Sequence, residues 1–107
     1  MLESRLPIVL KYLQDGLAKL LGDQLEAAYL YGSQARGTAR PDSDIDVVVV
    51  LRGEWDYFEM IEKTGALVTD LSLENETVIT LAFISREDFQ KHNTPFLMNV
   101  RREGIIL

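Results

Sequence analysis

The centre of the chain, residues 29–51, reads YLYGSQARGTARPDSDIDVVVVL. An apolar run ends at Gly32-Ser33, a polar stretch follows, and two carboxylates, Asp44 and Asp46, begin a second and very apolar run. Side chains two residues apart on a strand point to the same face of a sheet. The pattern therefore predicts a pair of carboxylates on one face, with the apolar residues that alternate with them directed at the core.

The connection between the two apolar runs decides the geometry of this region. Residues 26–31 and 44–51 are predicted strands, and the polar segment between them contains no convincing crossover helix. Parallel strands need a longer connection, usually with a helix, so we expect this pair to be antiparallel. The end of the first strand then lies beside the start of the second, and the Gly-Ser turn comes next to the two aspartates.

These residue types suit a divalent metal and a phosphate. Hard cations such as Mg²⁺ prefer carboxylate and phosphate oxygens, so both aspartates are candidate metal ligands. Two metals held in this way could clamp the attacking and leaving oxygens of a phosphoryl or nucleotidyl transfer. Ser33 and the N–H groups that follow Gly32 could bind phosphates, and Arg36 and Arg40 could offset the phosphate charge.

Each feature also has an ordinary structural explanation. Asp-x-Asp pairs are common at strand ends, and Ser43 and Asp44 could simply close the turn. Arg36 and Arg40 could be solvated loop charges. The combination at this spacing, between two apolar strands, is more specific than any of its parts.

Periodicity outside the centre predicts a small α/β (α+β) domain. The predicted elements are a helix over 4–21, strands over 26–31 and 44–51, a helix over 54–72, a strand over 77–84, a short helix over 86–91, a helix from Thr94-Pro95 to Gly104 and an edge strand over 105–107. This order, α-β-β-α-β-α-α, indicates a small mixed β-sheet flanked by helices. The aliphatic run Val47–Leu51 favours a central strand buried on both faces.

Helical spacing also predicts which side chains face the core. For the first helix these are Leu6, Leu10, Leu13, Leu17, Leu20 and Leu21, with Ser4 as the N-cap. For the second they are Trp55, Phe58, Ile61, Val68 and Leu71. The cluster of Phe89, Phe96, Leu97 and Met98 could cover the sheet or form an apolar partner surface. His92 is expected to be a surface or capping residue.

Composition restricts the classes of protein. The 107 residues suffice for one domain, 1–107, with one modest core. A net charge of −6 argues against a broad grip on nucleic acid, and the lack of cysteine excludes disulfides and thiolate metal sites. Glu3 and Arg5 interrupt the N-terminus, and no apolar run approaches the roughly 20 residues that a bilayer span needs. We therefore expect no membrane segment and a cytoplasmic protein.

Gly32-Ser33, followed after ten residues by Asp44-Ile-Asp46-Val, resembles the signature of the polymerase-β-like nucleotidyltransferase superfamily. The longer string 31–46 looks like its minimal, stand-alone MNT-type branch, and the segment Asn99–Gly104 is also similar to it. The resemblance implies Mg²⁺-dependent transfer of a nucleoside monophosphate from an NTP, with ATP the expected donor, to a partner protein or other acceptor. In that case Gly32 and Ser33 bind phosphates with help from Arg36, and Asp44 and Asp46 bind the metals.

The same resemblance suggests a partner. Many minimal members form the antitoxin half of a toxin–antitoxin pair with a helical HEPN-type protein, and some of them add AMP to that partner. A homodimer is a further possibility that the sequence leaves open.

One feature departs from the superfamily pattern. A third carboxylate usually stands on a later strand, where it completes the metal site and can act as a base. Here Thr80 or Ala82 occupies that place. Three acids lie upstream of this strand: Asp70, Glu74 and Glu76. One of them could reach the site from the loop, or all three could be ordinary solvated charges. Two functions therefore stay open, a nucleotidyltransferase and a catalytically degenerate nucleotide- or protein-binding module.

Overall fold

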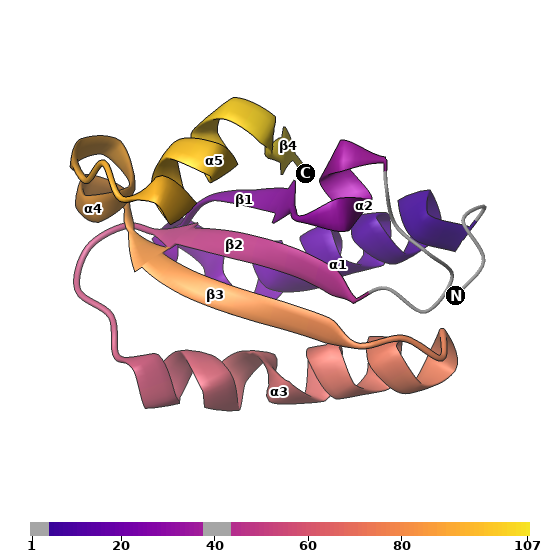
Figure 1. Cartoon of the computed structure of the whole chain (residues 1–107). Coiled ribbons are helices and arrows are strands. Elements are labelled where there is room, and N and C mark those ends of the chain that lie inside the picture. Colours follow the sequence, from indigo (N-terminus) through magenta and orange to yellow (C-terminus); the bar gives the residue numbers. More distant parts are fainter. Residues whose placement is uncertain (1–4, 38–43) are drawn as a thin grey trace.

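The computed structural model describes residues 5–37 and 44–107, and it confirms the predicted fold class (Figure 1). In chain order the elements are α1 (Leu6–Leu21), the 3-10 helix η2 (Gly22–Gln24), β1 (Leu25–Tyr31), α2 (Ser33–Arg36), β2 (Ile45–Leu51), α3 (Tyr57–Glu74), β3 (Ile79–Ser85), α4 (Arg86–Lys91), α5 (Pro95–Glu103) and β4 (Ile105–Ile106). No helix in the described part of the chain is both long and apolar enough to cross a bilayer.

The four strands form one mixed sheet in the order β3-β2-β1-β4. The predicted antiparallel pairing of β1 with β2 is confirmed, and it sets Tyr31 opposite Asp46. Strand β3 runs parallel to β2 and brings Thr80 beside Asp46. Strand β4 pairs antiparallel with β1 at the other edge, so the predictions of a central second strand and a C-terminal edge strand are both confirmed.

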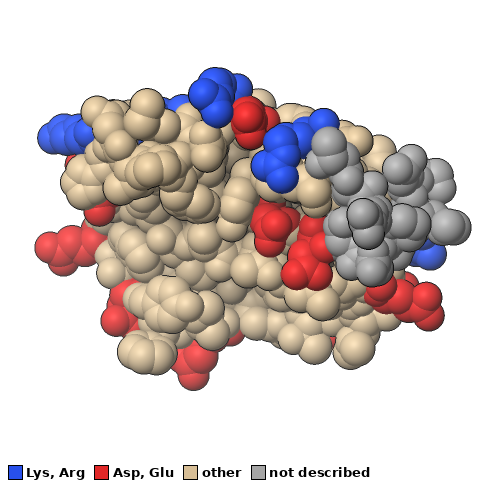
Figure 2. All heavy atoms as spheres, in the orientation of Figure 1, with Lys and Arg blue, Asp and Glu red and all other residues tan. Residues whose placement is uncertain are grey.

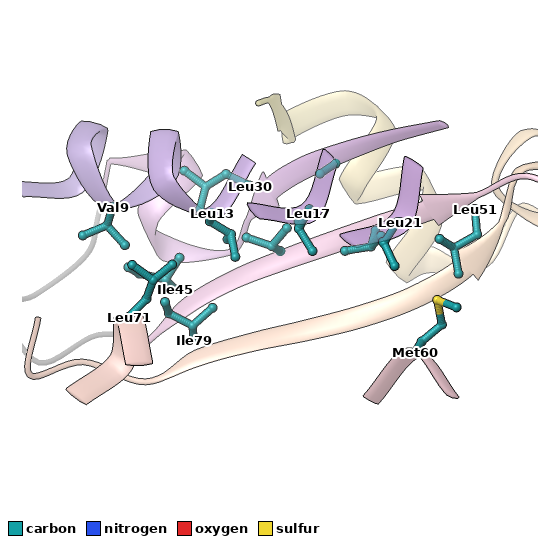
Figure 3. Packing of buried hydrophobic residues seen from close by; sticks show 13 residues of the cluster. Val9, Leu13, Leu17, Leu21, Leu30, Ile45, Leu51, Met60, Leu71 and Ile79 are labelled. Atoms are coloured by element: carbon teal, nitrogen blue, oxygen red, sulfur yellow. The ribbon is translucent and has the colours of Figure 1, made fainter. Parts of the chain in front are cut away.

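Helices α1 and α3 cover one face of the sheet (Figures 1 and 3). Four side chains of α1 at helical spacing, Val9, Leu13, Leu17 and Leu21, point at the strands and are buried. They pack against the alternate residues of β2 that face this side and against Met60 and Leu71 of α3. This cluster is the larger part of the hydrophobic core.

Helices α4 and α5 cover part of the opposite face. Phe89, Leu97 and Val100 pack on Val48 and Val50 of β2. Both helices begin with side-chain caps, because the Ser85 hydroxyl accepts from the Asp88 N–H and the Thr94 hydroxyl accepts from the Leu97 N–H. The predicted apolar cluster is thus divided: Phe89 and Leu97 cover the sheet, whereas Phe96 and Met98 are exposed.

Two parts of the predicted core are wrong. Leu20 is exposed, and Val9 takes a place in the buried stripe of α1; the proposed cap Ser4 lies outside the described residues. In α3 the side chains of Phe58 and Ile61 are exposed, Phe58 at 77 %.

The error in α3 has a physical cause. The buried stripe of this helix runs through Met60, Thr64 and Leu71, and the Thr64 hydroxyl donates to the Met60 carbonyl at 2.8 Å. A satisfied hydroxyl can be buried, so a stripe predicted from apolar residues alone leaves out Thr64, although the predicted Val68 and Leu71 do pack in the core. The helix also starts later than predicted, after the cap Asp56, and Trp55 lies before it.

Candidate functional site

The Gly-Ser turn and the aspartates meet at the junction of β1, α2 and β2, as the sequence predicted. Gly32 has φ 76° and ψ −154°, a conformation that side chains disfavour. A Cβ atom on Gly32 would stand 3.0 Å from Oδ2 of Asp46. The backbone after β1 therefore approaches the carboxylate of β2 as closely as it does only because residue 32 has no side chain.

Helix α2 follows directly from Gly32. The Arg36 N–H donates to the Gly32 carbonyl at 3.1 Å, which closes this single short turn. Ser33 is the first residue of the turn and is half-buried. The predicted phosphate-binding residues Gly32 and Ser33 are thus next to Asp46, whereas Arg40 and Ser43 lie outside the described residues.

Asp44 and Asp46 differ in their surroundings. Asp44 is exposed just before β2, and Asp46 is half-buried within the strand. Burial raises the pKa of Asp46 above its ordinary value, and the charge of Asp44 raises that pKa further. The charge of Asp44 thus lies close enough to disfavour the ionised form of Asp46, and a cation bound beside Asp46 would relieve this effect.

Tyr31 belongs to the same site, although the sequence reasoning did not select it. It lies opposite Asp46 in the β1–β2 register and meets the ring of Phe96 edge to face, with centroids 5.3 Å apart. Burial, and then the charge of Asp46, raise the pKa of its phenol. The signal that could have found it is its position immediately before Gly32, at the end of the paired strand.

A hollow lies between α2 and α5 beside this junction. Its volume is about 200 Å³, and its lining includes Tyr31, Gly32, Arg36, Phe96 and Glu103. The Arg36 guanidinium lies 3.9 Å from a Glu103 carboxylate oxygen, and both side chains are partly exposed. Figure 2 shows acidic and basic side chains side by side on this face of the molecule. Arg36 is therefore near the Gly-Ser turn but shares its charge with an acid that the sequence reasoning did not include.

The third carboxylate is missing from β3. Thr80, in register with Asp46 and exposed, occupies the position beside it, and Ala82 follows one step further along the same face. Across residues 5–37 and 44–107, no three His, Cys, Asp or Glu side chains gather closely enough to hold a metal. Within this part of the chain, none of the upstream acids Asp70, Glu74 and Glu76 joins the aspartate pair.

Comparison with known proteins supports the resemblance. The family model described as "Polymerase beta, Nucleotidyltransferase" matches residues 15–107. A relative from Methanocaldococcus jannaschii, with the provisional name protein adenylyltransferase MJ0604, is 36% identical over 85 residues, which cover 78% of this chain and 79% of the relative.

Solved structures have the same fold at lower identity. A variant of the toxin–antitoxin MntA-HpeT aligns with a TM-score of 0.60 at 22% identity, over 100% of this chain and 72% of the solved chain. A toxin–antitoxin solved with AMP-PNP aligns with a TM-score of 0.57 at 24% identity, over 87% and 70% of the two chains. A provisionally named nucleotidyltransferase from Sulfolobus solfataricus gives 0.53 at 18% identity, over 99% and 87%.

Proposed function

The chain belongs to the polymerase beta nucleotidyltransferase family, and on this premise we propose that it transfers a nucleoside monophosphate from ATP or another NTP to a hydroxyl of an acceptor protein. One observation carries the proposal. The Gly32 backbone lies against the Asp46 carboxylate, so a turn suited to phosphates and a pair of carboxylates suited to a cation occupy the same place.

The aspartate pair fits Mg²⁺. This ion takes one or two protein carboxylates and completes its shell with water and substrate phosphates. Asp44 and Asp46 offer such a pair, and the effect of the Asp44 charge on Asp46 favours a cation beside them. When bound, the ion would supply charge neutralisation at the reacting phosphate.

The remaining residues of the site would hold the triphosphate. Gly32 lets phosphate oxygens approach the backbone, the Ser33 hydroxyl can donate to one of them, and Arg36 can exchange its exposed contact with Glu103 for a phosphate. The acceptor hydroxyl oxygen forms a bond to the α-phosphorus. The bond from that phosphorus to the bridging oxygen breaks, and pyrophosphate leaves with the electron pair. The hydroxyl proton passes to water, since no third carboxylate stands beside Asp46 in the described part of the chain.

We propose that the acceptor is a protein, and specifically a helical HEPN-type toxin. The relative from M. jannaschii is named for adenylyl transfer to protein, and several chains of the same fold come from toxin–antitoxin complexes, one of them with a HEPN toxin that is described as AMPylated.

A second candidate is a module that binds nucleotide without turnover. The observation that favours it is Thr80, which stands in register with Asp46 where a catalytic carboxylate would be expected. Threonine can neither coordinate a second metal as an anion nor accept the acceptor proton.

A label-transfer experiment separates the two candidates. The protein is incubated with Mg²⁺, α-³²P-ATP and a HEPN-type protein from an adjacent reading frame, where one is encoded there, in parallel with Asp44→Asn and with Asp23→Asn as the control for an exposed aspartate distant from the site. Transfer by the unmodified chain and by Asp23→Asn, but not by Asp44→Asn, supports the enzyme. Nucleotide binding without transfer supports the module, and neither binding nor transfer would reject both.

A further inference from the structure

The outer edge of β3 is an unpaired strand edge. Strand β3 is terminal in the sheet, and in the described part of the chain its only strand partner is β2. Its sequence, Ile-Thr-Leu-Ala-Phe-Ile-Ser, has no charged residue, no proline and no glycine. Natural proteins usually protect an open edge with charges, proline, a bulge or a very short strand. This seven-residue edge has none of those protections.

The hydrogen-bonding pattern shows which backbone groups point outward. The Val78 carbonyl accepts from the Ile45 N–H of β2, so Thr80, Ala82 and Ile84 also direct their backbone groups toward β2. The alternate residues direct theirs to the outer edge, and the Ile79 N–H accordingly donates to the Ser72 hydroxyl of α3 rather than to a strand. Leu81 and Phe83 therefore offer their N–H and carbonyl groups to an additional strand.

An apolar groove runs beside this edge. It lies between α3 and β3, has a volume of about 260 Å³, and has no charged residue in its lining, which includes Ile61, Gly65, Val68 and Leu81. Phe58 and Ile61, the two residues of α3 that the sequence wrongly placed in the core, are exposed on this helix. Figure 1 shows α3 running alongside β3, below the sheet. The strand edge and the groove together form one continuous uncharged strip.

We infer that this strip is a self-association surface, on which β3 of a second copy pairs antiparallel to β3 and extends the two sheets into one. A row of outward N–H and carbonyl groups is recognised by another strand. The strip also lacks charge on a chain whose net charge is −6, so it is a place where two copies can meet without opposing like charges.

The direction of the backbone groups determines the register. Outward-facing residues must lie opposite outward-facing residues, and a two-fold axis at Ala82 satisfies this condition for Leu81 and Phe83. Leu81 then bonds with Phe83 of the second copy, and Phe83 with its Leu81. The two Ala82 residues face each other as a non-hydrogen-bonded pair, in which Cβ atoms lie about 4.5–5.5 Å apart. This inference does not depend on the proposed transfer activity.

Because the chain contains no cysteine, one engineered cysteine tests the register directly. Ala82→Cys should form a disulfide-linked dimer under mild oxidation, since the two Cβ atoms come close to disulfide range on the two-fold axis. Thr80→Cys is the matched control, because residue 80 would lie opposite residue 84 and not opposite itself. A linked dimer of Ala82→Cys that is absent for Thr80→Cys is the expected result. Cross-linking of Thr80→Cys alone would overturn the inference.

Solution mass provides a second and independent measurement. The unmodified chain should sediment as a dimer of a 12.1 kDa chain. Ile61→Lys places a charge in the strip at an exposed position, so it should keep the fold, judged by circular dichroism, and raise the dimer dissociation constant by about tenfold or more. A monomer at all concentrations, or a dimer that Ile61→Lys leaves unchanged, would contradict the inference.

Discussion

On one face of β2, helices cover the strand along its whole length. On the other face, helices cover only its later residues and leave its start open. The side chains toward α1 and α3 are all fully buried: Ile45, Val47, Val49 and Leu51. On the opposite face Val48 and Val50 are buried beneath α4 and α5, but Asp46 is half-buried and Asp44 is exposed. On this face, the later residues of β2 therefore belong to the hydrophobic core, whereas the start of the strand carries the candidate site. The candidate site lies where the helix cover ends.

The largest expected effect is on the sealed face. Leu13→Ala removes a fully buried side chain of α1 and should lower the free energy of unfolding by about 2–5 kcal/mol. Phe96→Ala, at the open end of the other face, should cost less than about 1.5 kcal/mol, because this ring is partly exposed and its main aromatic contact is Tyr31. Urea denaturation measures both values. Equal costs would mean that the two faces do not differ as described.

Gly32 tests the contact at the junction. Gly32→Ala should cost about 1–3 kcal/mol, since alanine resists this backbone conformation and its Cβ would crowd Oδ2 of Asp46. It should also weaken nucleotide binding. Gly37→Ala is the control: its φ is nearly the same, but its Cβ would meet nothing within 4 Å, so only stability should fall. Loss of nucleotide binding in both variants would show that the contact with Asp46 is not the cause.

A substitution at Thr80 tests whether the candidate metal site at the open end of β2 lacks only one carboxylate. Thr80→Asp sets a third acid in register with Asp46 and should tighten Mg²⁺ binding on the order of tenfold, because affinity follows the number of charged ligands. Ala82→Asp puts the same charge one step further along the strand and should have a smaller effect. Isothermal titration with Mg²⁺ distinguishes the two. Equal gains would point to general charge rather than to a defined position.

The smallest expected effect is the amount by which the ionised Asp46 carboxylate lowers the free energy of unfolding. The folded protein raises the pKa of this carboxyl, so its favourable contribution to stability is complete below the ordinary Asp pKa of 3.8 and is lost as the pH rises through the raised value. Asp46→Asn should therefore be slightly more stable than the unmodified chain at pH 7, by less than about 1 kcal/mol since the site is partly solvated. The gain should vanish in acid. Thermal unfolding at both pH values checks this, and a loss of stability at pH 7 would reverse the assignment.

The junction could be predicted from the sequence because its contacts are local. A short connection between two consecutive strands allows one arrangement, the antiparallel pair, and that arrangement brings Gly32 to Asp46. The position of Thr80 beside Asp46 depends on a parallel pairing between strands separated by the whole of α3, and sequence periodicity does not determine such a register.

Other residues escaped prediction for chemical reasons. Thr64 is buried in α3 because its hydroxyl is satisfied within the helix, which a search for apolar stripes overlooks. Tyr31 and Glu103 have no distinctive spacing, and they join the site only once β1 and α5 have packed beside α2.

The most direct test of the central claim is a calorimetric titration with the ATP analogue AMP-PNP, without an acceptor protein, in the presence of Mg²⁺ or of EDTA. If Asp44 and Asp46 hold a metal beside the Gly32-Ser33 turn, the unmodified chain should bind AMP-PNP with Mg²⁺ and lose most of that affinity with EDTA. The Asp44→Asn/Asp46→Asn double variant should bind equally weakly in both conditions. Binding that is independent of the metal, or that survives in the double variant, would contradict this account of the site.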